Sequence, residues 1–316
     1  MSNEEKIINY FIKNYNKIGD DCAYLSQTKQ LISSDTLVEN KHFDLKYFTP
    51  KNIAHRLFTA NYSDIQSSGG KPKYVLLNVS FPNKNFKFVN KILKNFHRYC
   101  LEYGIEIIGG DTTASDKIFL SLTIMSDVIN KNDVIKRSQA KINDKIYTFS
   151  GIGYSKLGYL NIYKKLKLPK SISTFSKKQF LNPKIYTYYD VFKKFKLNSC
   201  MDLSDSLLTA LRSISSQSNK KIVLNNLSNI NKKLHEYFKY DQHYNSVILS
   251  SGEEFVPVFT SSLDLLKLNN YKSFKKRGIE ITCIGHVEKG QGVHLKNFNL
   301  NKVKIFDHFK SNYSVL

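Results

Sequence analysis

Apolar and polar residues alternate along the first half of the chain in patterns that predict strands and helices in turn. Residues 74–81, YVLLNVSF, are rich in β-formers, and residues 86–103 place apolar side chains at helical spacing until Gly104 ends the helix. Residues 105–108, IEII, predict a short buried strand, and the alternation in residues 118–128, IFLSLTIMSDV, predicts another. The first half is therefore expected to combine strands with helices.

The second half repeats this mixture after a polar and charged stretch, which places a domain boundary near residues 130–136. Residues 144–151, DKIYTFSG, begin a second series of strands. A chain of 316 residues with 41% hydrophobic content can bury a sizeable core, and this length favours two domains. We predict an α/β fold of the α+β type, with mixed sheets and helices, in two domains of residues 1–134 and 135–316.

The charge balance adds a question about partners. The chain has 48 Lys and Arg against 26 Asp and Glu, a formal net charge of +22. Such a balance is typical of proteins that bind nucleic acid or anionic membranes. The lysines are spread among many Asn, Ile, Tyr and Phe residues, however, a mixture that low-GC codon usage produces. The densest basic segment, residues 161–184, predicts a helix end and a solvated loop. We therefore do not expect nucleic acid as a partner.

The cysteines and the N-terminus indicate the compartment. Four cysteines are scattered without a CxxC pair, which argues against a disulfide framework or a cysteine zinc site. Residues 1–17 suit an amphipathic first helix and not a signal peptide, and no later run is long and apolar enough for a membrane span. The sequence predicts a cytoplasmic protein with reduced thiols and no membrane partner.

Acids stand beside Gly, Ser or Thr after apolar runs at five places, although the chain has few acids overall. These places carry Asp20 with Asp21, Asp35, Asp64, Asp111, and Asp202 with Asp205. Four of them follow or interrupt predicted strands. Asp64 instead lies on a predicted helix, with Leu57, Asn61 and Ser68 on about the same face. An acid on such an apolar stripe needs a partner.

Each of these acids also has an ordinary structural interpretation. Asp and Ser are frequent in turns and at helix N-caps, and Ser204 or Asp205 is a good N-cap candidate for the helix that follows. Asp20 and Asp21 fit a surface turn, and backbone amides alone would satisfy a buried Asp64. Five cases of one pattern nevertheless favour a shared site over five unrelated caps.

The chemistry of such a shared site points to a metal and a phosphate. Mg²⁺ prefers oxygen ligands and usually combines one or two carboxylates with water and substrate phosphates. Glycines beside Asp111 let backbone amides approach phosphate oxygens, and hydroxyls of Ser33, Ser34, Thr112 and Thr113 add further contacts. The glycine-rich loops of the common nucleotide-binding motifs are absent. The sequence therefore predicts a nucleotide phosphate site of a different kind.

With these residues assembled, the chain resembles the thiamine-monophosphate kinase family, whose superfamily includes aminoimidazole ribonucleotide synthetase and selenophosphate synthetase. The resemblance covers nearly the whole chain, because eight blocks occur in the family's order. These blocks are IGDDCAYL, SSDTLVENKHF, NYSDIQSSGGKP, IIGGDTTAS, KRSQAKINDKIYTFSG, MDLSDSLL, LSSGEEF and IFDHF. Each block alone is weak, and the ordered set is specific.

The resemblance implies ATP-dependent phosphorylation of thiamine monophosphate to thiamine diphosphate, with ATP as co-substrate and several Mg²⁺ ions. It implies that residues 1–134 bind ATP and Mg²⁺ and form a homodimer, and that residues 135–316 complete the nucleotide and substrate site. The implied metal ligands are Asp21, Ser33, Ser34, Asp35, Asp64, Asp111, Asp202 and Asp205, with catalytic roles for Asp35, Asp64, Asp111 and Asp205. The implied ATP contacts are Gly110, Asp111, Arg137 and Ser204, and the implied thiamine phosphate contacts are His42, Glu253 and Phe306.

Several positions have a plainer interpretation or depart from the family. Without the resemblance, His42 is a loop histidine, Arg137 a solvated cation, Phe306 a core aromatic and Glu253 a turn residue. The departures are Ser206 and Ser251, which replace usual glycines, Tyr154, which replaces a usual aspartate, and Val256, which replaces a usual acid. The two serines would disfavour any backbone shape that needs positive φ.

Two other functions remain open at the level of sequence. The first is another ATP-using enzyme of the same superfamily, although Cys22 is poorly placed for the reactive residue of a selenophosphate synthetase. The second is a basic nucleic-acid-binding protein on a degenerate kinase fold. Such a protein would bind with a steep salt dependence and would not turn over ATP.

Overall fold

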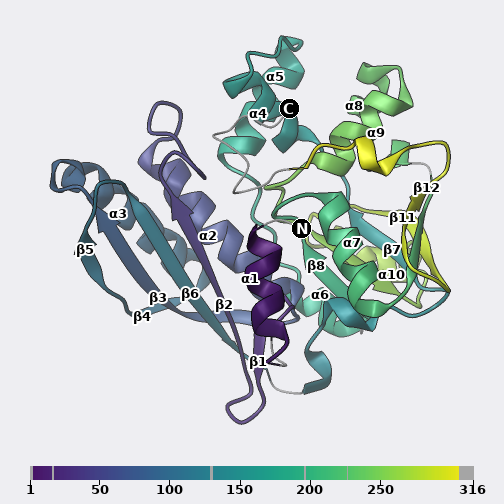
Figure 1. Ribbon diagram of the computed structural model, residues 1–316, viewed down its shortest axis with the longest axis horizontal. Coiled ribbons are helices and arrows are strands. Elements are labelled where there is room, and N and C mark those ends of the chain that lie inside the picture. The colour runs from purple at the N-terminus through teal and green to yellow at the C-terminus, as the bar shows by residue number, and fades with distance from the viewer. Residues whose placement is uncertain (1–2, 16–17, 129–130, 196, 226, 306–316) are drawn as a thin grey trace. The chain divides into compact units, whose positions relative to one another are not determined.

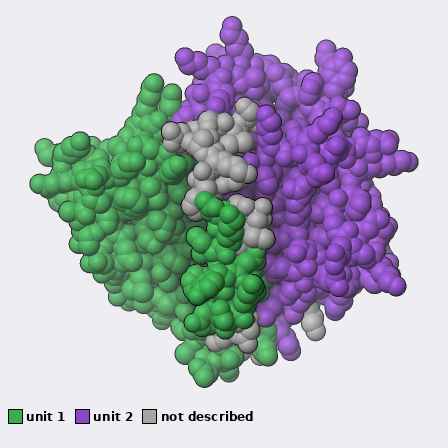
Figure 2. Space-filling model, viewed as in Figure 1, with its two compact units in different colours: residues 1–66, 70–131, 307–314 green, residues 67–69, 132–306, 315–316 purple. Residues whose placement is uncertain are grey.

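The computed structural model describes residues 3–15, 18–128, 131–195, 197–225 and 227–305 (Figure 1). Contacts divide the chain into two compact units (Figure 2). Within the described residues, unit 1 contains the chain up to residue 66 and residues 70–131, and unit 2 contains residues 67–69 and 132–305. The division falls in the polar stretch that separates the two series of strands.

The described part of unit 1 is a six-stranded mixed sheet in the order β1-β2-β6-β3-β4, with β5 also paired to β3. Its strands are β1 (Ala23–Leu25), β2 (Gln30–Val38), β3 (Lys71–Phe81), β4 (Glu106–Gly109), β5 (Thr112–Ala114) and β6 (Phe119–Asp127). Strands β4 and β5 pair parallel to β3, and the other pairs are antiparallel. Helices α2 (Pro50–Ser67) and α3 (Phe86–Tyr103) cover one face of this sheet (Figure 1).

Helix α3 follows the predicted pattern of apolar positions. It buries Val89, Ile92, Phe96 and Cys100, and the Phe96 ring lies 6.3 Å from the ring of Phe58 on α2. The helix ends at Gly104, which adopts φ 65° and donates its backbone N–H to carbonyls of the last turn. The first helix is also present, as α1 (Asn3–Ile12), and its described side chains are exposed.

The prediction for residues 105–108 is half wrong. A strand, β4, does form there, but Ile107 and Ile108 are 40% and 49% exposed. The physical reason is that β4 is an edge strand, which pairs with β3 alone, so its second edge has no neighbouring strand in the described sheet. Together with Leu76 and Phe119 it leaves apolar surface open on unit 1.

Unit 2 contains a second six-stranded sheet in the order β12-β9-β11-β7-β10-β8. Its strands are β7 (Lys145–Phe149), β8 (Ser199–Asp202), β9 (Lys221–Leu224), β10 (Pro257–Ser261), β11 (Ile281–Glu288) and β12 (Gly292–Leu295). Its helices are α4 (Tyr154–Tyr163), α5 (Lys170–Leu181), α6 (Tyr189–Phe195), α7 (Leu207–Ser218), α8 (Lys232–Phe238), α9 (Asp241–Ser250) and α10 (Leu268–Lys275). Two mixed sheets with helices confirm the predicted α/β fold class.

The core of unit 2 lies on both faces of the sheet at β10 and at its neighbour β8, since every residue of these two strands is buried although β8 ends the sheet. Aromatic rings fill much of it. The ring of Phe259 on β10 lies 4.9 Å from that of Phe192 and 5.7 Å from that of Tyr147. The Tyr147 hydroxyl is satisfied inside the core, because it donates to the carbonyl of Leu263 and accepts from the amide of Leu265.

The basic segment at residues 161–184 is more ordered than the sequence predicted. It contains the end of α4, a short connection and the whole of α5, so the expectation of a loop is wrong for α5. The two helices pack closely because α4 has a glycine at the contact: a Cβ on Gly158 would lie 2.2 Å from the Ser176 carbonyl oxygen. This packing directs Phe180 inward and leaves the α5 lysines at the surface.

The start of α7 also corrects a prediction. The N-cap is Ser206 and not Ser204 or Asp205, and its hydroxyl accepts the amide N–H of Thr209 at 3.1 Å. The sequence favoured the earlier positions because Ser and Asp are both good caps and the exact boundary depends on the backbone. None of the described helices is both long enough and apolar enough to cross a bilayer.

Replacing Ser206 by Ala should lower the free energy of unfolding by about 1 kcal/mol, because the N–H of Thr209 loses its acceptor. The exposed Ser216 in the same helix provides the matched control. Ser216→Ala should change stability by less than about 0.5 kcal/mol. Urea denaturation of both variants measures the difference, and an equal loss in the two would contradict the N-cap assignment.

Candidate functional site

Two of the predicted metal ligands come together in unit 1. One carboxylate oxygen of Asp21 and one of Asp64 lie within 4.8 Å of each other. The Ser33 hydroxyl donates a hydrogen bond of 2.7 Å to Oδ2 of Asp64. Asp64 and Ser33 are each 8% exposed, while Asp21 is partly exposed. Three separate elements thus bring oxygen ligands to one place: the segment before β1, strand β2 and helix α2.

The strand geometry of β2 decides which of its polar side chains can join them. Side chains alternate between the two faces of a strand, so Ser33 and Asp35 share one face and Ser34 takes the other. The hydroxyl of Ser34 indeed lies 3.1 Å from that of Thr123 on β6. The structure therefore brings Ser33 to Asp64 and directs the side chain of Ser34 away from it.

Helix α2 explains why an acid is buried at position 64. Leu57, Asn61 and Asp64 lie along one buried stripe of the helix, as the sequence predicted. The Asn61 amide group donates to the carbonyl of Leu57 at 2.9 Å, while its own oxygen is buried without a hydrogen-bond partner. Asp64 is thus presented by a rigid helix and is not part of a mobile loop.

This pair of carboxylates fits a hard cation. Two close carboxylates repel each other unless a cation or a proton offsets their charge. Carboxylate and hydroxyl oxygens are the ligands that Mg²⁺ prefers, with one or two carboxylates for each ion. Among the residues described, Asp35 and Asp111 do not lie within 4.8 Å of both carboxylates. Unit 1 therefore offers a core of Asp21 and Asp64 for one ion.

Asp111 lies in a tight turn between β4 and β5. Gly109 and Gly110 adopt φ values of 157° and 150°. A Cβ on Gly110 would lie 1.8 Å from the Leu77 carbonyl oxygen, so only glycine fits against β3. The Asp111 carbonyl accepts from Val79 at 2.9 Å, and its carboxylate accepts the following amide N–H at 2.8 Å. The exposed Asp111 carboxylate is therefore held by the turn itself.

His42 is fixed in the loop after β2. Its Nδ1 accepts the backbone N–H of Val38 at 3.0 Å, which assigns the proton of the neutral ring to Nε2. The backbone carbonyl of His42 accepts a hydrogen bond of 3.0 Å from Arg56. Arg56 is 1% exposed, and its guanidinium lies 4.7 Å from the Phe48 ring centroid. The loop is thus anchored from inside unit 1.

Unit 2 holds a second group of predicted residues at the end of β8. Asp202 is 1% exposed and pairs with Pro257 on β10. Ser204 and Asp205 follow in the turn that leads into α7 and are partly exposed. We refer to residues 203–205 as the β8–α7 turn. Arg137 also belongs to unit 2, where its backbone carbonyl accepts the Ser218 hydroxyl at 2.9 Å.

Residues 251–255 contain the predicted substrate contact Glu253 and are here named the substrate loop for that prediction. They pack directly on the β8–α7 turn. A Cβ on Gly252 would lie 1.9 Å from the Asp205 carbonyl oxygen. The amide of Glu253 donates to the carbonyl of Ser204, and the amides of Glu254 and Phe255 donate to that of Leu203. The structure therefore brings Glu253 together with Ser204 and Asp205, which lie almost fifty positions earlier in the chain. Phe306 lies outside the described residues.

The two serines at usual glycine positions are accommodated without strain. Ser206 has φ −172° and Ser251 has φ −74°, so neither position requires the left-handed region that disfavours a side chain. The expected backbone conflict is therefore wrong. Both hydroxyls are used instead: Ser206 caps α7, and Ser251 donates to the Glu254 carboxylate at 2.6 Å.

The first two turns of α4 contribute residues that the sequence did not single out. Burial lowers the pKa of Lys156 to about 8, and its ammonium lies 6.0 Å from the ring centroid of Tyr159. Burial and, after it, the charge of Glu253 raise the pKa of Tyr159, which places these two groups within electrostatic range. Lysine and tyrosine on a helix are too common for the sequence alone to reveal this.

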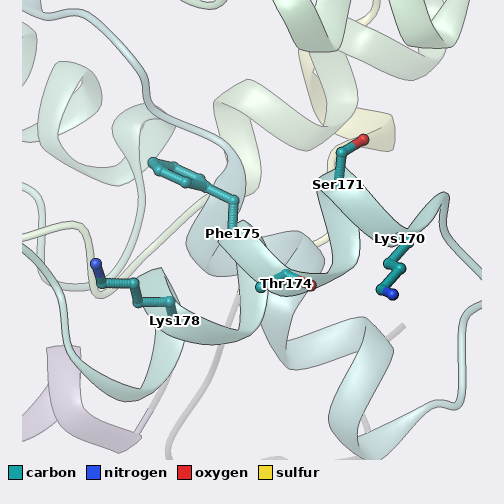
Figure 3. Close-up of a pocket in the computed structure, with 5 residues that line it drawn as sticks. All are labelled: Lys170, Ser171, Thr174, Phe175 and Lys178. Atoms are coloured by element: carbon teal, nitrogen blue, oxygen red, sulfur yellow. The ribbon is translucent and has the colours of Figure 1, made fainter.

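A shallow groove lies on α5 (Figure 3). It is lined by Lys170, Ser171, Thr174, Phe175 and Lys178, all from one helix. The ring of Phe175 meets that of Tyr154 edge-on at 4.5 Å, so the tyrosine at the usual aspartate position belongs to a local aromatic contact. None of the predicted site residues lines this groove.

The fold and these groups define a class of protein. Residues 19–128 match the family described as AIR synthase related protein, N-terminal domain. That segment contains the Asp21–Asp64 pair, His42 and the Gly110–Asp111 turn.

The whole chain supports a closer assignment. It is 33% identical over 329 residues to the thiamine-monophosphate kinase of Buchnera aphidicola subsp. Schizaphis graminum, covering 97% of this chain and 99% of that protein. The chain therefore belongs to the thiamine-monophosphate kinase family.

Solved structures agree in fold. A thiamine monophosphate kinase from Aquifex aeolicus superposes with a TM-score of 0.76 at 22% identity, over 95% of this chain and 99% of that one. A structure of AaThiL complexed with AMPPCP and TMP gives 0.74 at 24% identity, over 92% of each chain. At this identity the likeness establishes the architecture of the chain.

Replacing Gly110 by Ala should lower the free energy of unfolding by at least about 3 kcal/mol, because the new Cβ clashes with the backbone of β3. The matched control is Gly104→Ala. Gly104 also has positive φ, at 65°, but a Cβ there would meet nothing within 4 Å. This control should cost only about 1–2 kcal/mol. Chemical denaturation compares the two, and equal losses would contradict the close approach at Gly110.

Proposed function

We propose that this protein transfers the γ-phosphoryl group of ATP to the phosphate of thiamine monophosphate, giving thiamine diphosphate and ADP. The observation that carries the proposal is the 33% identity to a thiamine-monophosphate kinase across 97% of the chain. The acid pair of unit 1 and the substrate loop of unit 2 supply the residue types that this reaction needs. The solved AaThiL structure, complexed with AMPPCP and TMP, supports the same pair of substrates.

The chemistry of the acceptor explains why carboxylates dominate and a strong general base is missing from the proposed set. A phosphate monoester has a second pKa near about 6, so its oxygen is already largely ionised at neutral pH. The main obstacle is bringing two polyanions into line. Phosphoryl transfer therefore depends on positioning and on electrostatic stabilisation, and it requires no covalent phospho-enzyme.

Mg²⁺ fits the oxygen ligands described above, and when bound it would neutralise charge on the phosphate oxygens. The proposed ligands are Asp21, Ser33, Ser34, Asp35, Asp64, Asp111, Asp202 and Asp205. In this set Asp21, Asp64 and Ser33 rest on the contacts seen in unit 1. Ser34 would act through its backbone, because its hydroxyl lies on the opposite face of β2.

The remaining roles concern the two substrates. Gly110, Asp111, Arg137 and Ser204 are proposed to contact ATP, and Gly110 and Asp111 are exposed in the turn between β4 and β5. His42, Glu253 and Phe306 are proposed to contact thiamine monophosphate. The thiazolium ring of that substrate is cationic and flat, so a carboxylate and an aromatic ring suit it chemically. Asp35 and Asp205 complete the proposed catalytic set with Asp64 and Asp111.

We also propose that the protein is a homodimer formed through unit 1. The support is the open apolar surface around β4, where Leu76, Ile107, Ile108 and Phe119 are 36–49% exposed. Apolar side chains gathered on an edge strand and its neighbours favour burial against a second copy. The cytoplasmic location stays a prediction from the sequence.

Incubating the protein with ATP, Mg²⁺ and thiamine monophosphate tests the proposed reaction. Separation of the products should show thiamine diphosphate and an equal amount of ADP. Thiamine in place of thiamine monophosphate serves as the control for the acceptor. If neither thiamine diphosphate nor ADP accumulates, the proposal is wrong, and steeply salt-dependent oligonucleotide binding in the same preparation would then favour the nucleic-acid alternative.

Asp64→Asn and Asp111→Asn should each lower kcat at least about 100-fold while the protein stays folded, because each removes a charge that holds Mg²⁺. The exposed Asp116, close to Asp111 in the chain, is the matched control, and Asp116→Asn should leave kcat within about 2-fold. Steady-state assays at saturating Mg²⁺ measure the effect. Near wild-type turnover of either variant would remove that residue from the metal site.

His42→Ala should raise the KM for thiamine monophosphate about 10-fold, which corresponds to about 1.4 kcal/mol of lost binding. The KM for ATP should change less than about 3-fold. The control is His97→Ala, which removes an exposed imidazole from α3. An unchanged KM for thiamine monophosphate would exclude a role of His42 in substrate binding.

A further inference from the structure

The start of α4 is capped in an unusual way. Its N-cap residue is Gly153, which has φ 108° and offers no side-chain acceptor for the free amides of the first turn. Those amides are instead satisfied by the substrate loop. Oε1 of Glu254 accepts the N–H of Gly153 at 2.8 Å and that of Ser155 at 3.2 Å, and the Ser251 hydroxyl accepts the N–H of Lys156 at 3.2 Å.

Glu254 is therefore the acceptor at the centre of a closed network. Besides the two amides, it accepts the Ser251 hydroxyl at 2.6 Å, and it is 2% exposed. A carboxylate at a helix N-terminus is favoured both by these bonds and by the helix dipole. Burial raises the pKa of the Glu254 carboxyl, and hydrogen bonds from Ser251, Gly153, Ser155 and Gln179 act in the opposite direction.

The backbone of the same loop is held on its other side by the β8–α7 turn. The amides of Glu253, Glu254 and Phe255 donate to carbonyls of that turn. The substrate loop is thus held on two sides. Its side-chain oxygens accept hydrogen bonds from amides of α4, and its backbone amides donate to carbonyls of the β8–α7 turn.

This double attachment stabilises a backbone shape that is costly by itself. Glu253 and Phe255, on either side of Glu254, adopt φ values of 53° and 49°. For residues other than glycine, such left-handed conformations cost about 1–2 kcal/mol each. They persist only where surrounding contacts impose them, and this happens mainly at functional sites.

We propose that Glu254 is a positioning residue, whose buried carboxylate clamps the substrate loop to the first turn of α4 and thereby fixes Glu253 for the acceptor substrate. The inference rests on the proposed function, in which Glu253 contacts thiamine monophosphate. Glu254 belongs to the substrate loop, but its side chain is buried and contacts other groups of the protein. Its effect on the reaction is therefore indirect and acts on acceptor binding.

The test is a set of steady-state kinetics on Glu254→Gln and Glu254→Met. Gln keeps one weaker neutral acceptor, and Met of similar size keeps none. The KM for thiamine monophosphate should rise about 10-fold in the Gln variant and further in the Met variant, while the KM for ATP changes less than about 3-fold. If the Met variant does not fold, the KM values of the Gln variant alone test the proposal.

The matched control is another buried acid of unit 2. Asp144 is 0% exposed and accepts hydrogen bonds from Lys141, Asn198 and Thr260. Asp144 itself lies about a hundred residues before the substrate loop. Asp144→Asn should lower the melting temperature and leave both KM values unchanged, because unfolding reduces the number of active molecules and not their affinity. An unchanged KM for thiamine monophosphate in Glu254→Gln, or an equal rise in both KM values, would overturn the proposal.

The pH dependence of protein stability distinguishes a positioning role of Glu254 from a purely structural role. A carboxyl whose pKa is raised on folding stabilises the protein fully below its unfolded value of about 4.3, and this contribution is lost as pH rises through the raised pKa. The Glu254→Gln variant has no ionisable carboxyl at this position, so it does not lose stability in this way as pH rises. The melting temperature of Glu254→Gln relative to wild type should therefore rise as pH increases through the raised pKa of Glu254, while acceptor binding is impaired. A parallel fall in stability and affinity would instead mean structural support alone.

Wild-type protein in the same assay distinguishes failure of the clamp from failure of the proposed function. If wild type forms no thiamine diphosphate, the proposed function is wrong, and hydrogen exchange still measures the clamp itself. Exchange of the Gly153 and Ser155 amides and of the substrate loop should then be faster in Glu254→Gln than in wild type. Equal exchange would overturn the clamp.

Discussion

Repulsion between like charges is the constraint on which the proposed site depends. Carboxylates do not gather at one place unless each is held by the fold and offset by a partner, and unit 1 shows how this is done for Asp21 and Asp64. Ser33 donates to one carboxylate from a strand, and a helix presents that carboxylate from the other side. The chain's net charge of +22 works in the same direction, since a positive field favours both ionised acids and anionic substrates.

Local patterns in the sequence predicted the elements that carry these groups. The helical spacing of residues 86–103, the strands around them and the buried face of α2 all appear in the structure, because each depends on residues close together in the chain. The ordered family blocks also predicted the family correctly. The exposure of β4 was not predicted, because the sequence of a short apolar strand does not show that the strand lies at the edge of its sheet.

Candidate site residues could be named from the sequence, where they stay predictions, but their geometry could not be predicted. Neighbouring side chains of a strand point to opposite faces, but the bounds of β2 were not predicted, and for this reason Ser34 looked equivalent to Ser33. Contacts between the substrate loop and the β8–α7 turn join segments almost fifty residues apart, and no local sequence pattern predicts such contacts. The serines at glycine positions were misjudged for a related reason, since φ at a turn is set by the contacts on both sides of it.

The tertiary cap of α4 has a consequence for how unit 2 forms. The acceptors for the first turn of α4 lie about a hundred residues further along the chain, so this helix start gains its hydrogen bonds only after β10 and the substrate loop have reached their places. Loop closure over such a separation is slow compared with helix formation. Unit 2 should therefore complete the cap of α4 late in folding, when segments about a hundred residues apart meet, and a newly made chain would lack this cap until residues 251–255 had been synthesised.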